Sequence, residues 1–269
     1  MSNPILSLND LTIHFGGINA INKLSFDVQE GSISSLIGPN GAGKTTCFNC
    51  ISGFYKPDSG SIMLKDKQIA GLPSYKIAEY GVARTYQNIR TYSDLTVLEN
   101  ILAGQHDRLR SNLFDAMFHT KRFRDEDKQA LIEAGRIQEL MGLDGLGDTL
   151  ARNLPYGDQR RLEIARAIAS KPSLLLLDEP SAGMNPTETQ DLVRLIRKLR
   201  DEIGITIFII EHDMHVVMGI SDEIAVLDFG NKIAEGKPAE IQSNSRVIEA
   251  YLGPGGAALA KKYRRKKAS

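Results

Sequence analysis

The residues best suited to chemistry form a glycine-rich loop between an apolar segment and a predicted helix. Residues 38–46 fit the phosphate-binding pattern G-x-x-x-x-G-K-[ST]. Ile33 to Ile37 before the loop are expected to form a buried strand, and Thr46 to Ser52 after it a helix. Because glycines allow close backbone approach, N–H groups and a helix N-terminus would converge on phosphate oxygens. The candidate phosphate-binding residues are Gly38, Pro39, Asn40, Gly41, Ala42, Gly43, Lys44, Thr45 and Thr46.

A second candidate for chemistry is the acidic pair Asp178 and Glu179. The pair follows Leu174 to Leu177, a continuous apolar run that predicts a parallel strand buried on both faces. Acidic groups at the carboxyl end of a strand can hold Mg²⁺ and orient a water molecule when phosphates lie nearby. Together with the phosphate loop, the pair predicts a site for ATP and Mg²⁺.

The segments around these motifs predict an α/β fold. Ile5 to Phe15 and Ile18 to Val28 alternate partly with period two around a Gly16-Gly17 turn, which predicts an N-terminal hairpin. The other strands expected are Ser61 to Leu64, Val82 to Thr85 and Thr206 to Ile210, with short edge strands at Ile224 to Leu227 and Lys232 to Ala234.

Helical patterns dominate the middle of the chain and return after the acidic pair. Thr96, followed three residues later by Glu99, predicts a capping box. Asn185, Pro186 and Glu188 predict the start of a later helix by the same reasoning. The residues that repeat at helical spacing in the middle of the chain are Ala130, Ala134, Ile137 and Met141.

Composition excludes several classes of function. The chain has 269 residues with 33 Lys+Arg and 33 Asp+Glu, so no overall basic field argues for nucleic acid as a partner. No apolar run approaches the roughly 20 residues that span a bilayer, and no signal-peptide pattern opens the sequence. We therefore expect a cytosolic protein.

Two smaller features have plain interpretations. Cys47 and Cys50 form a C-x-x-C pair within the predicted helix after the phosphate loop, where a redox or metal role would need further ligands. We expect both to be small buried core residues. The basic run at residues 261–267 could touch anionic lipid, but we favour a solvated tail.

Taken in chain order, the motifs resemble those of ATP-binding cassette (ABC) transporter ATPases. The segments that carry this resemblance are Gly38 to Thr46, Gln87, Leu154 to Gln159, Leu174 to Pro180, Ser181 to Asn185 and His212. Those similar to the LivG-type subunit of branched-chain amino acid importers are Phe15 to Gly17, Ser52 to Pro57, Arg160 to Arg166 and Glu211 to Met214.

The resemblance implies a fold and a domain division. The expected fold is a P-loop NTPase of the ABC ATPase type, with a RecA-like core, an N-terminal antiparallel β-subdomain and an inserted α-helical subdomain. The ATPase domain would span residues 1–253, with its core at 1–87 and 160–253 and the helical lobe at about 88–159. Residues 254–269 would form a disordered basic tail, and residues 105–127 have no assigned role.

The resemblance also implies which residues bind the nucleotide and its metal. Lys44 would contact the β- and γ-phosphates and Thr45 would bind Mg²⁺, while Asp178 would hold the metal through water. Gln87 would sense both the metal and the γ-phosphate. Phe15 would stack on the adenine ring.

Two further residues would carry hydrolysis. Glu179 would be the general base that polarises the attacking water, and His212 would contact the γ-phosphate and keep that water in line. Such roles suit phosphoryl transfer, in which positioning and charge stabilisation provide most of the catalysis. With Gln87, these residues are the predicted catalytic group.

The sequence departs from the family in its signature segment. The usual Leu-Ser-Gly-Gly-Gln appears as Leu-Pro-Tyr-Gly-Asp at residues 154–158. In this family the signature of one subunit completes the ATP site of another, and Pro155 lacks the hydroxyl that would bind the γ-phosphate. We hypothesise that the backbone N–H of Gly157 and the following helix N-terminus make this contact in trans.

The function implied is that of the ATP-hydrolysing subunit of an importer, with branched-chain amino acids as the favoured solutes. Its partners would be a second ATPase subunit, transmembrane permease subunits and, indirectly, a periplasmic binding protein, at the cytoplasmic face of the inner membrane. An alternative is a soluble cassette ATPase acting on protein or nucleic-acid assemblies, although such members usually carry two cassettes. A small-molecule P-loop kinase would leave residues 154–159 and His212 unexplained.

Overall fold

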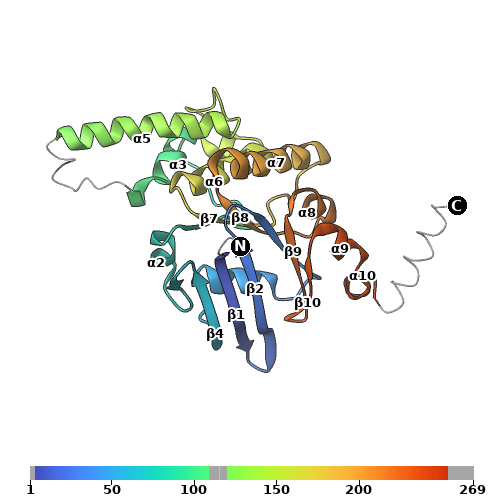
Figure 1. Ribbon diagram of the computed structural model, residues 1–269. Coiled ribbons are helices and arrows are strands. Elements are labelled where there is room, and N and C mark those ends of the chain that lie inside the picture. The colour runs from blue at the N-terminus through green and yellow to red at the C-terminus, as the bar shows by residue number, and fades with distance from the viewer. Residues whose placement is uncertain (1–3, 109–114, 116–119, 254–269) are drawn as a thin grey trace.

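Two β-sheets organise the part of the chain that the computed structural model describes, residues 4–108, 115 and 120–253 (Figure 1). The larger sheet has the strand order β10-β9-β3-β8-β7-β6 and the smaller one β2-β1-β4-β5. The larger sheet contains β3 (Ile33–Ile37), β6 (Val82–Arg84), β7 (Leu174–Asp178), β8 (Thr206–Ile210), β9 (Glu223–Asp228) and β10 (Asn231–Gly236). The smaller sheet contains β1 (Pro4–Phe15), β2 (Ile18–Gln29), β4 (Ser59–Leu64) and β5 (Lys67–Gln68).

The centre of the larger sheet is parallel and fully buried. Every residue of β3, β7 and β8 is buried, as expected of continuous apolar strands that are covered on both faces. β8 lies between β3 and β7 and pairs in parallel with both. The carboxyl ends of β3, β7 and β8 therefore lie along one side of the sheet, with the phosphate loop directly after β3 and the acidic pair at the end of β7.

The prediction of two edge strands near the C-terminus is wrong for one of them. β9 pairs in parallel with β3 on one side and antiparallel with β10 on the other, so only β10 lies at the edge. Residues Ile224 to Leu227 of β9 are all buried. The hairpin turn after β9 indicates one antiparallel partner, but it says nothing about the strand on the other side.

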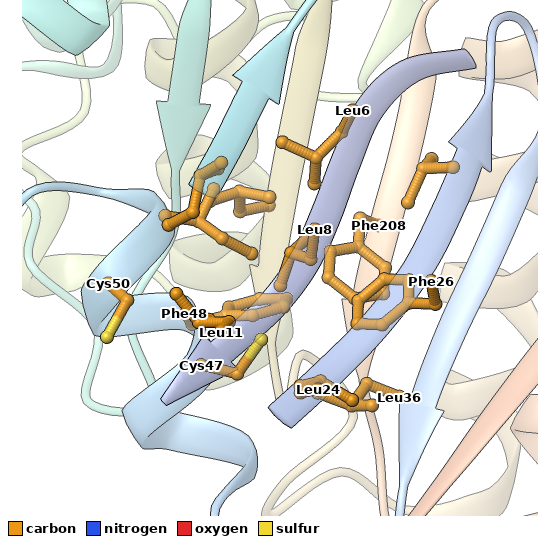
Figure 2. Close-up of a cluster of buried hydrophobic side chains, with 14 of the residues drawn as sticks. Leu6, Leu8, Leu11, Leu24, Phe26, Leu36, Cys47, Phe48, Cys50 and Phe208 are labelled. Carbon is orange, nitrogen blue, oxygen red and sulfur yellow. The ribbon is translucent and has the colours of Figure 1, made fainter. Parts of the chain in front are cut away.

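The predicted N-terminal hairpin is confirmed, and its apolar face builds a core with the larger sheet. Leu8 and Leu11 of β1 belong to one buried cluster with Phe48, a residue of α1 (Lys44–Ile51), and Phe208 of β8 (Figure 2). The Phe48 and Phe208 ring centroids are 5.0 Å apart, and the ring centroid of Phe26 in β2 lies 5.3 Å from that of Phe208. This cluster attaches the smaller sheet to α1 and thus to the phosphate loop.

The two cysteines are core residues, as predicted. Cys47 and Cys50 are free thiols, both 0 % exposed within this apolar cluster (Figure 2). Burial raises the pKa of the Cys50 thiol to about 12 and that of Cys47 well above its ordinary value. Buried protonated thiols of this kind behave as small apolar groups.

Helices form a group above the sheets and a second group beside β9 and β10 (Figure 1). α3 contacts α5 and α6, and α5 also contacts α6. The first group comprises α3 (Val97–Ala103), α5 (Lys121–Leu140), α6 (Tyr156–Ala169) and α7 (Pro186–Lys198). The second comprises α8 (Met214–Ile220), α9 (Pro238–Ser243) and α10 (Ser245–Leu252), while α2 (Ser74–Glu79) lies near β6. Short helical turns of other types are His106–Arg108, Ala151–Asn153 and Leu199–Ile203.

Both predicted capping boxes are present. The Thr96 hydroxyl accepts the Glu99 N–H and the Glu99 carboxylate accepts the Thr96 N–H, and Asn185 and Glu188 make the same exchange at the start of α7. The 159/160 boundary of the expected helical lobe falls within α6, so one continuous helix belongs to both sides of it.

Two predicted features lie partly or wholly beyond the structural description. The basic run at 261–267 lies outside the described residues, as does part of segment 105–127. Among the described helices, none combines the length and the apolar character needed to cross a bilayer.

Candidate active site

The phosphate loop connects β3 to α1 through glycines that no other residue could replace. Gly38 has φ 152° and Gly43 has φ 104°, both in the region that L side chains rarely adopt. A Cβ atom at Gly38 would lie 2.1 Å from the Leu227 carbonyl oxygen, and one at Gly43 would lie 2.4 Å from that of Ala20. The glycines therefore allow the loop to pass between β9 and β2.

The loop presents an anion-binding helix start. α1 begins at Lys44, two residues earlier than predicted, because Gly43 acts as its N-cap. No side chain caps this end of the helix, and the Thr45 side chain is exposed beside it. Since the first N–H groups of a helix have no intrahelical acceptor, a phosphate could occupy this position.

The side chain of Lys44 bonds back to the start of the phosphate loop. Its Nζ atom donates to the carbonyl oxygens of Gly38 at 2.7 Å and Pro39 at 3.0 Å. Desolvation by burial lowers the pKa of Lys44, while the charges of Glu179 and Asp178 oppose this effect. The ammonium group is thus held at the phosphate loop by groups that it could exchange for phosphate oxygens.

Three predicted catalytic side chains, which follow β6, β7 and β8, meet at one point. Gln87 Nε2 donates to Glu179 Oε2 at 2.9 Å, and His212 Nδ1 lies 3.5 Å from the same oxygen. Within the described part of the chain, neither group binds the other carboxylate oxygen, Oε1. Glu179 has φ 46°, and its N–H donates to the Ile210 carbonyl oxygen at 2.9 Å, so the turn after β7 directs its side chain.

Glu211 has no predicted role in the sequence analysis. Its side chain joins the two loops that carry Glu179 and His212. This carboxylate is fully buried and accepts the Ser181 N–H at 2.8 Å and the His212 N–H at 3.1 Å. It thereby joins the segment after Glu179 to the segment with His212. The sequence feature that could have indicated this role is a charged residue directly after a buried strand.

Sequence reasoning also missed Arg84, which binds the predicted metal carboxylate. Arg84 Nη2 lies 2.8 Å from Asp178 Oδ2, and the two side chains are 6 % and 5 % exposed. Arg84 Nη1 donates to Asn49 Oδ1 at 2.8 Å and to Ser52 Oγ at 2.7 Å. Arg84 of β6 therefore connects β7 to α1. The sequence feature that could have indicated this role is a charged residue within a short apolar strand.

Phe15 and Gly157 lie apart from this group. Phe15 is 46 % exposed at the hairpin turn, with its ring centroid 5.2 Å from that of Tyr55. Gly157 lies in the first turn of α6, where an added Cβ atom would be 3.4 Å from Glu188 Oε1. Within the described residues no hydrogen bond or ring contact joins Phe15 or Gly157 to the phosphate loop. Their predicted roles depend on a bound nucleotide or a second chain.

Comparison with known proteins decides the family. The model of the family described as ABC transporter matches residues 21–182, which is more than half of the chain. The chain belongs to this ABC transporter family. A second model, described as branched-chain amino acid ATP-binding cassette transporter, matches residues 231–253.

Several curated relatives are similar over nearly their full length. The high-affinity branched-chain amino acid transport ATP-binding protein LivG of Salmonella typhimurium is 50 % identical over 253 residues, which cover 94 % of this chain and 99 % of the relative. LivG of Escherichia coli K12 is 49 % identical and BraF of Pseudomonas aeruginosa 48 % identical, with the same coverage.

Solved structures confirm the predicted fold. A nucleotide-free ATP-binding cassette from an ABC transporter is 32 % identical with a TM-score of 0.80, and the ADP conformation of an ATP-binding cassette of an ABC transporter is 32 % identical with a TM-score of 0.81. Each comparison covers 94 % of this chain and 100 % of the other. The chain is accordingly an ABC ATPase, whose activity is ATP hydrolysis coupled to transport.

Proposed function

We propose that the chain hydrolyses ATP at the cytoplasmic face of the inner membrane to power the import of branched-chain amino acids. The convergence of Gln87, Glu179 and His212 after three adjacent strands carries the catalytic part of this proposal. The solute is supported by the names of the relatives and by the match at residues 231–253.

The geometry suits Glu179 as the general base. Gln87 Nε2 and His212 Nδ1 both face Oε2, which fixes the carboxylate and leaves Oε1 to accept a proton from water. In this proposal His212 also contacts the γ-phosphate, and Gln87 senses whether that phosphate is bound. The half-exposed imidazole of His212, 54 % accessible at its side chain, is open to a ligand.

The nucleotide would be held from two sides. Residues 38–46 provide backbone N–H groups, and Lys44 exchanges its two carbonyl acceptors for phosphate oxygens. Phe15 would stack on the adenine, since its ring is half exposed at the hairpin turn. Each of these contacts is a property of the single chain and needs no partner.

The residues present also fit Mg²⁺, a hard cation that prefers oxygen ligands. The exposed Thr45 hydroxyl, the Asp178 carboxylate and the Gln87 amide oxygen are suitable donors, because Gln87 already uses its Nε2 on Glu179. When bound, Mg²⁺ would supply positive charge that neutralises the phosphates. Arg84, which lies 2.8 Å from Asp178 Oδ2, would hold the Asp178 carboxylate in place at this site.

Replacement of Glu179 by Gln tests the catalytic proposal. We expect Glu179→Gln to bind ATP normally but to hydrolyse it about a hundredfold or more slowly, because an amide cannot take the proton. Single-turnover hydrolysis and nucleotide binding should be measured on the same preparation. Asp213→Asn, which alters a nearby carboxylate that caps α8, is a matched control. Near-normal turnover by Glu179→Gln would contradict the base role.

A second copy or related chain is proposed to complete each ATP site through residues 154–158. Pro155 is the N-cap of α6 and offers no side-chain acceptor or donor to the helix start. The first turn of α6 therefore keeps backbone N–H groups available for a ligand, which supports the Gly157 backbone contact in trans. The same proposal divides the ATPase domain, residues 1–253, into a core and a helical lobe at about 88–159 that carries this contact.

A groove beside the Gln87 segment is the proposed docking place for the permease subunits. It has a volume of about 570 Å³ and lies between α2, β6 and α6. Phe54 and Tyr75 line it and are 51 % and 62 % exposed, and aromatic side chains are enriched at protein interfaces. Arg84 and Tyr86 line its inner wall, so the groove adjoins both Asp178 and Gln87.

The docking proposal predicts that Tyr75→Ala weakens recovery of the subunit with its permeases at least about fivefold, as expected for an exposed aromatic anchor. Ile203→Ala, which changes a residue that is 50 % exposed and does not line this groove, is the matched control. Equal recovery of both variants would contradict docking at this groove.

Transport itself decides the solute and separates this proposal from the soluble alternative. The subunit should be reconstituted in liposomes with the permeases and binding protein encoded beside it, and uptake of leucine and of histidine should be compared. ATP-dependent leucine uptake supports the proposal. Histidine uptake alone would contradict the solute, and hydrolysis without association with permeases would favour the soluble alternative.

A further inference from the structure

Two fully buried charged side chains of α6 have no part in the mechanism described above. Arg160 is 0 % exposed and is among the largest fully buried residues, and Glu163 is 2 % exposed. Arg160 Nη1 lies 2.8 Å from Glu163 Oε2. Since taking two charges out of water is costly, their remaining partners show what the pair does.

Those partners are backbone groups on both sides of Gln87. Arg160 donates from Nη1 to the Tyr86 carbonyl oxygen at 2.7 Å and from Nη2 to the Gln87 carbonyl oxygen at 2.8 Å. Glu163 Oε1 accepts the Tyr86 N–H at 3.3 Å and the Arg90 N–H at 3.1 Å. The pair thus holds four backbone groups of segment 86–90.

Among the described residues, the backbone of segment 86–90 has no hydrogen-bond partners other than these two side chains. It follows β6 without helix or strand structure of its own, and the last ladder-like contact before it is the Thr85 N–H to the Leu176 carbonyl oxygen at 3.0 Å. Because irregular backbone must obtain its hydrogen bonds from side chains or water, Arg160 and Glu163 set where the Gln87 side chain begins.

The same arginine is close to the loop after Glu179. Tyr156 OH lies 3.4 Å from Arg160 Nη2 and donates to the Ala182 carbonyl oxygen at 2.9 Å. Tyr156 belongs to the candidate signature segment at the start of α6. The start of α6 is therefore bonded to the segments on both sides of the Gln87–Glu179 hydrogen bond.

We propose that Arg160 and Glu163 are positioning residues for Gln87, and that they make the start of α6 and segment 86–90 move as one unit. This inference rests on the proposed function, in which the start of α6 contacts ATP held by a partner subunit. When the start of α6 contacts ATP in the partner's site, it then fixes the position of Gln87 in the chain's own site. Gln87 in turn orients Glu179 through their hydrogen bond.

Glu163→Gln is the sharpest perturbation of this pair. Whichever way the new amide turns, its NH₂ group faces a donor, either Arg160 Nη1 or the N–H groups of Tyr86 and Arg90. In the assembled transporter we expect kcat to fall about tenfold, since small misplacement of catalytic groups is costly, with KM for ATP within about twofold. Arg161→Gln is the matched control, because Arg161 lies on the same helix and pairs with Asp191 at 3.7 Å instead.

A double-mutant cycle separates positioning from general destabilisation. If Glu163 acts through Gln87, adding Glu163→Gln to a Gln87→Ala background should lower kcat by less than about twofold. If Gln87→Ala is slow by itself and Glu163→Gln lowers its kcat as much as it lowers the kcat of wild type, the two residues act independently. That result would overturn the inference and leave the proposed function standing. An unchanged kcat for Gln87→Ala alone would overturn the inference together with the proposed role of Gln87.

A second variant serves if Glu163→Gln does not fold. Arg160→Met combined with Glu163→Leu removes both buried charges, and such apolar replacements of an ion pair are often tolerated. The same loss of kcat and the same cycle with Gln87→Ala are expected for it. Wild-type kcat in a folded Arg160→Met/Glu163→Leu variant would overturn the inference.

Discussion

Removal of Arg84 should destabilise the protein strongly, although the residue lies beside a groove that is open to solvent. In Arg84→Met the Asp178 carboxylate stays 5 % exposed but loses its cationic partner. Breaking a buried pair by removing one member costs about 3–5 kcal/mol. The lost hydrogen bonds to Asn49 and Ser52 add to this cost, because they leave two further polar groups of α1 without this donor.

The size of the effect can be measured as a shift in melting temperature. At about 2–4 °C per kcal/mol for a domain of this size class, Arg84→Met should melt roughly 6–20 °C lower than wild type. Thermal unfolding followed by circular dichroism provides the assay. Arg90→Met is the matched control, because Arg84 and Arg90 lie over the Tyr86 ring at 5.2 and 4.7 Å, but the Arg90 guanidinium pairs with no carboxylate of the described residues. The control should melt within about 2 °C of wild type, as for other exposed substitutions.

A double variant tests whether the loss comes from the stranded carboxylate. In Arg84→Met/Asp178→Leu both charges of this pair are removed, so no carboxylate is left without Arg84 and at least half of the lost stability should return. A melting temperature for Arg84→Met within about 2 °C of wild type would refute the reasoning. A double variant that melts lower than Arg84→Met would do the same, since it would show that the two effects are independent.

Three other predictions concern separate parts of the molecule. Gly43→Ala should abolish ATP binding in equilibrium titrations, because its Cβ atom would lie 2.4 Å from the Ala20 carbonyl oxygen; normal affinity would contradict the loop geometry. Because burial raises the pKa of Cys50 to about 12, iodoacetamide should leave it unlabelled at pH 8 and react only as the pH rises toward that value, whereas rapid labelling of folded protein at pH 8 would refute the burial argument. Pro155→Ser should change the ATPase rate of the assembled complex by less than about tenfold, and a larger change would show that the side chain at this position matters more than the helix start.

Local patterns in the sequence predict the elements of this fold better than they predict their neighbours. The continuous apolar run Leu174 to Leu177 and the capping boxes at Thr96 and Asn185 depend on residues a few positions apart, and all three are confirmed. The position of β9 depends on pairing with β3, which lies far away in the chain. A hairpin turn contains no information about that pairing.

The catalytic group shows the same limit. Resemblance predicted that Gln87, Glu179 and His212 act together, and the structure brings them to one carboxylate oxygen, but their catalytic roles stay predictions. Arg84 and Glu211 escaped prediction because a buried charge has meaning only through a partner that another strand or loop supplies. Single charges at or beside otherwise apolar strands are the features to examine first in such sequences.

The two carbonyl oxygens that hold the Lys44 ammonium have a consequence for ligand selectivity. Any anion that binds the Lys44 ammonium must displace the bonds of 2.7 and 3.0 Å that it makes to the loop backbone. A lone inorganic phosphate would gain little from this exchange, because it replaces one set of charge-assisted bonds by another. A polyphosphate that reaches Lys44 and the start of α1 together recovers the cost through several contacts at once. We therefore expect the loop to bind a polyphosphate more tightly than a single phosphate group.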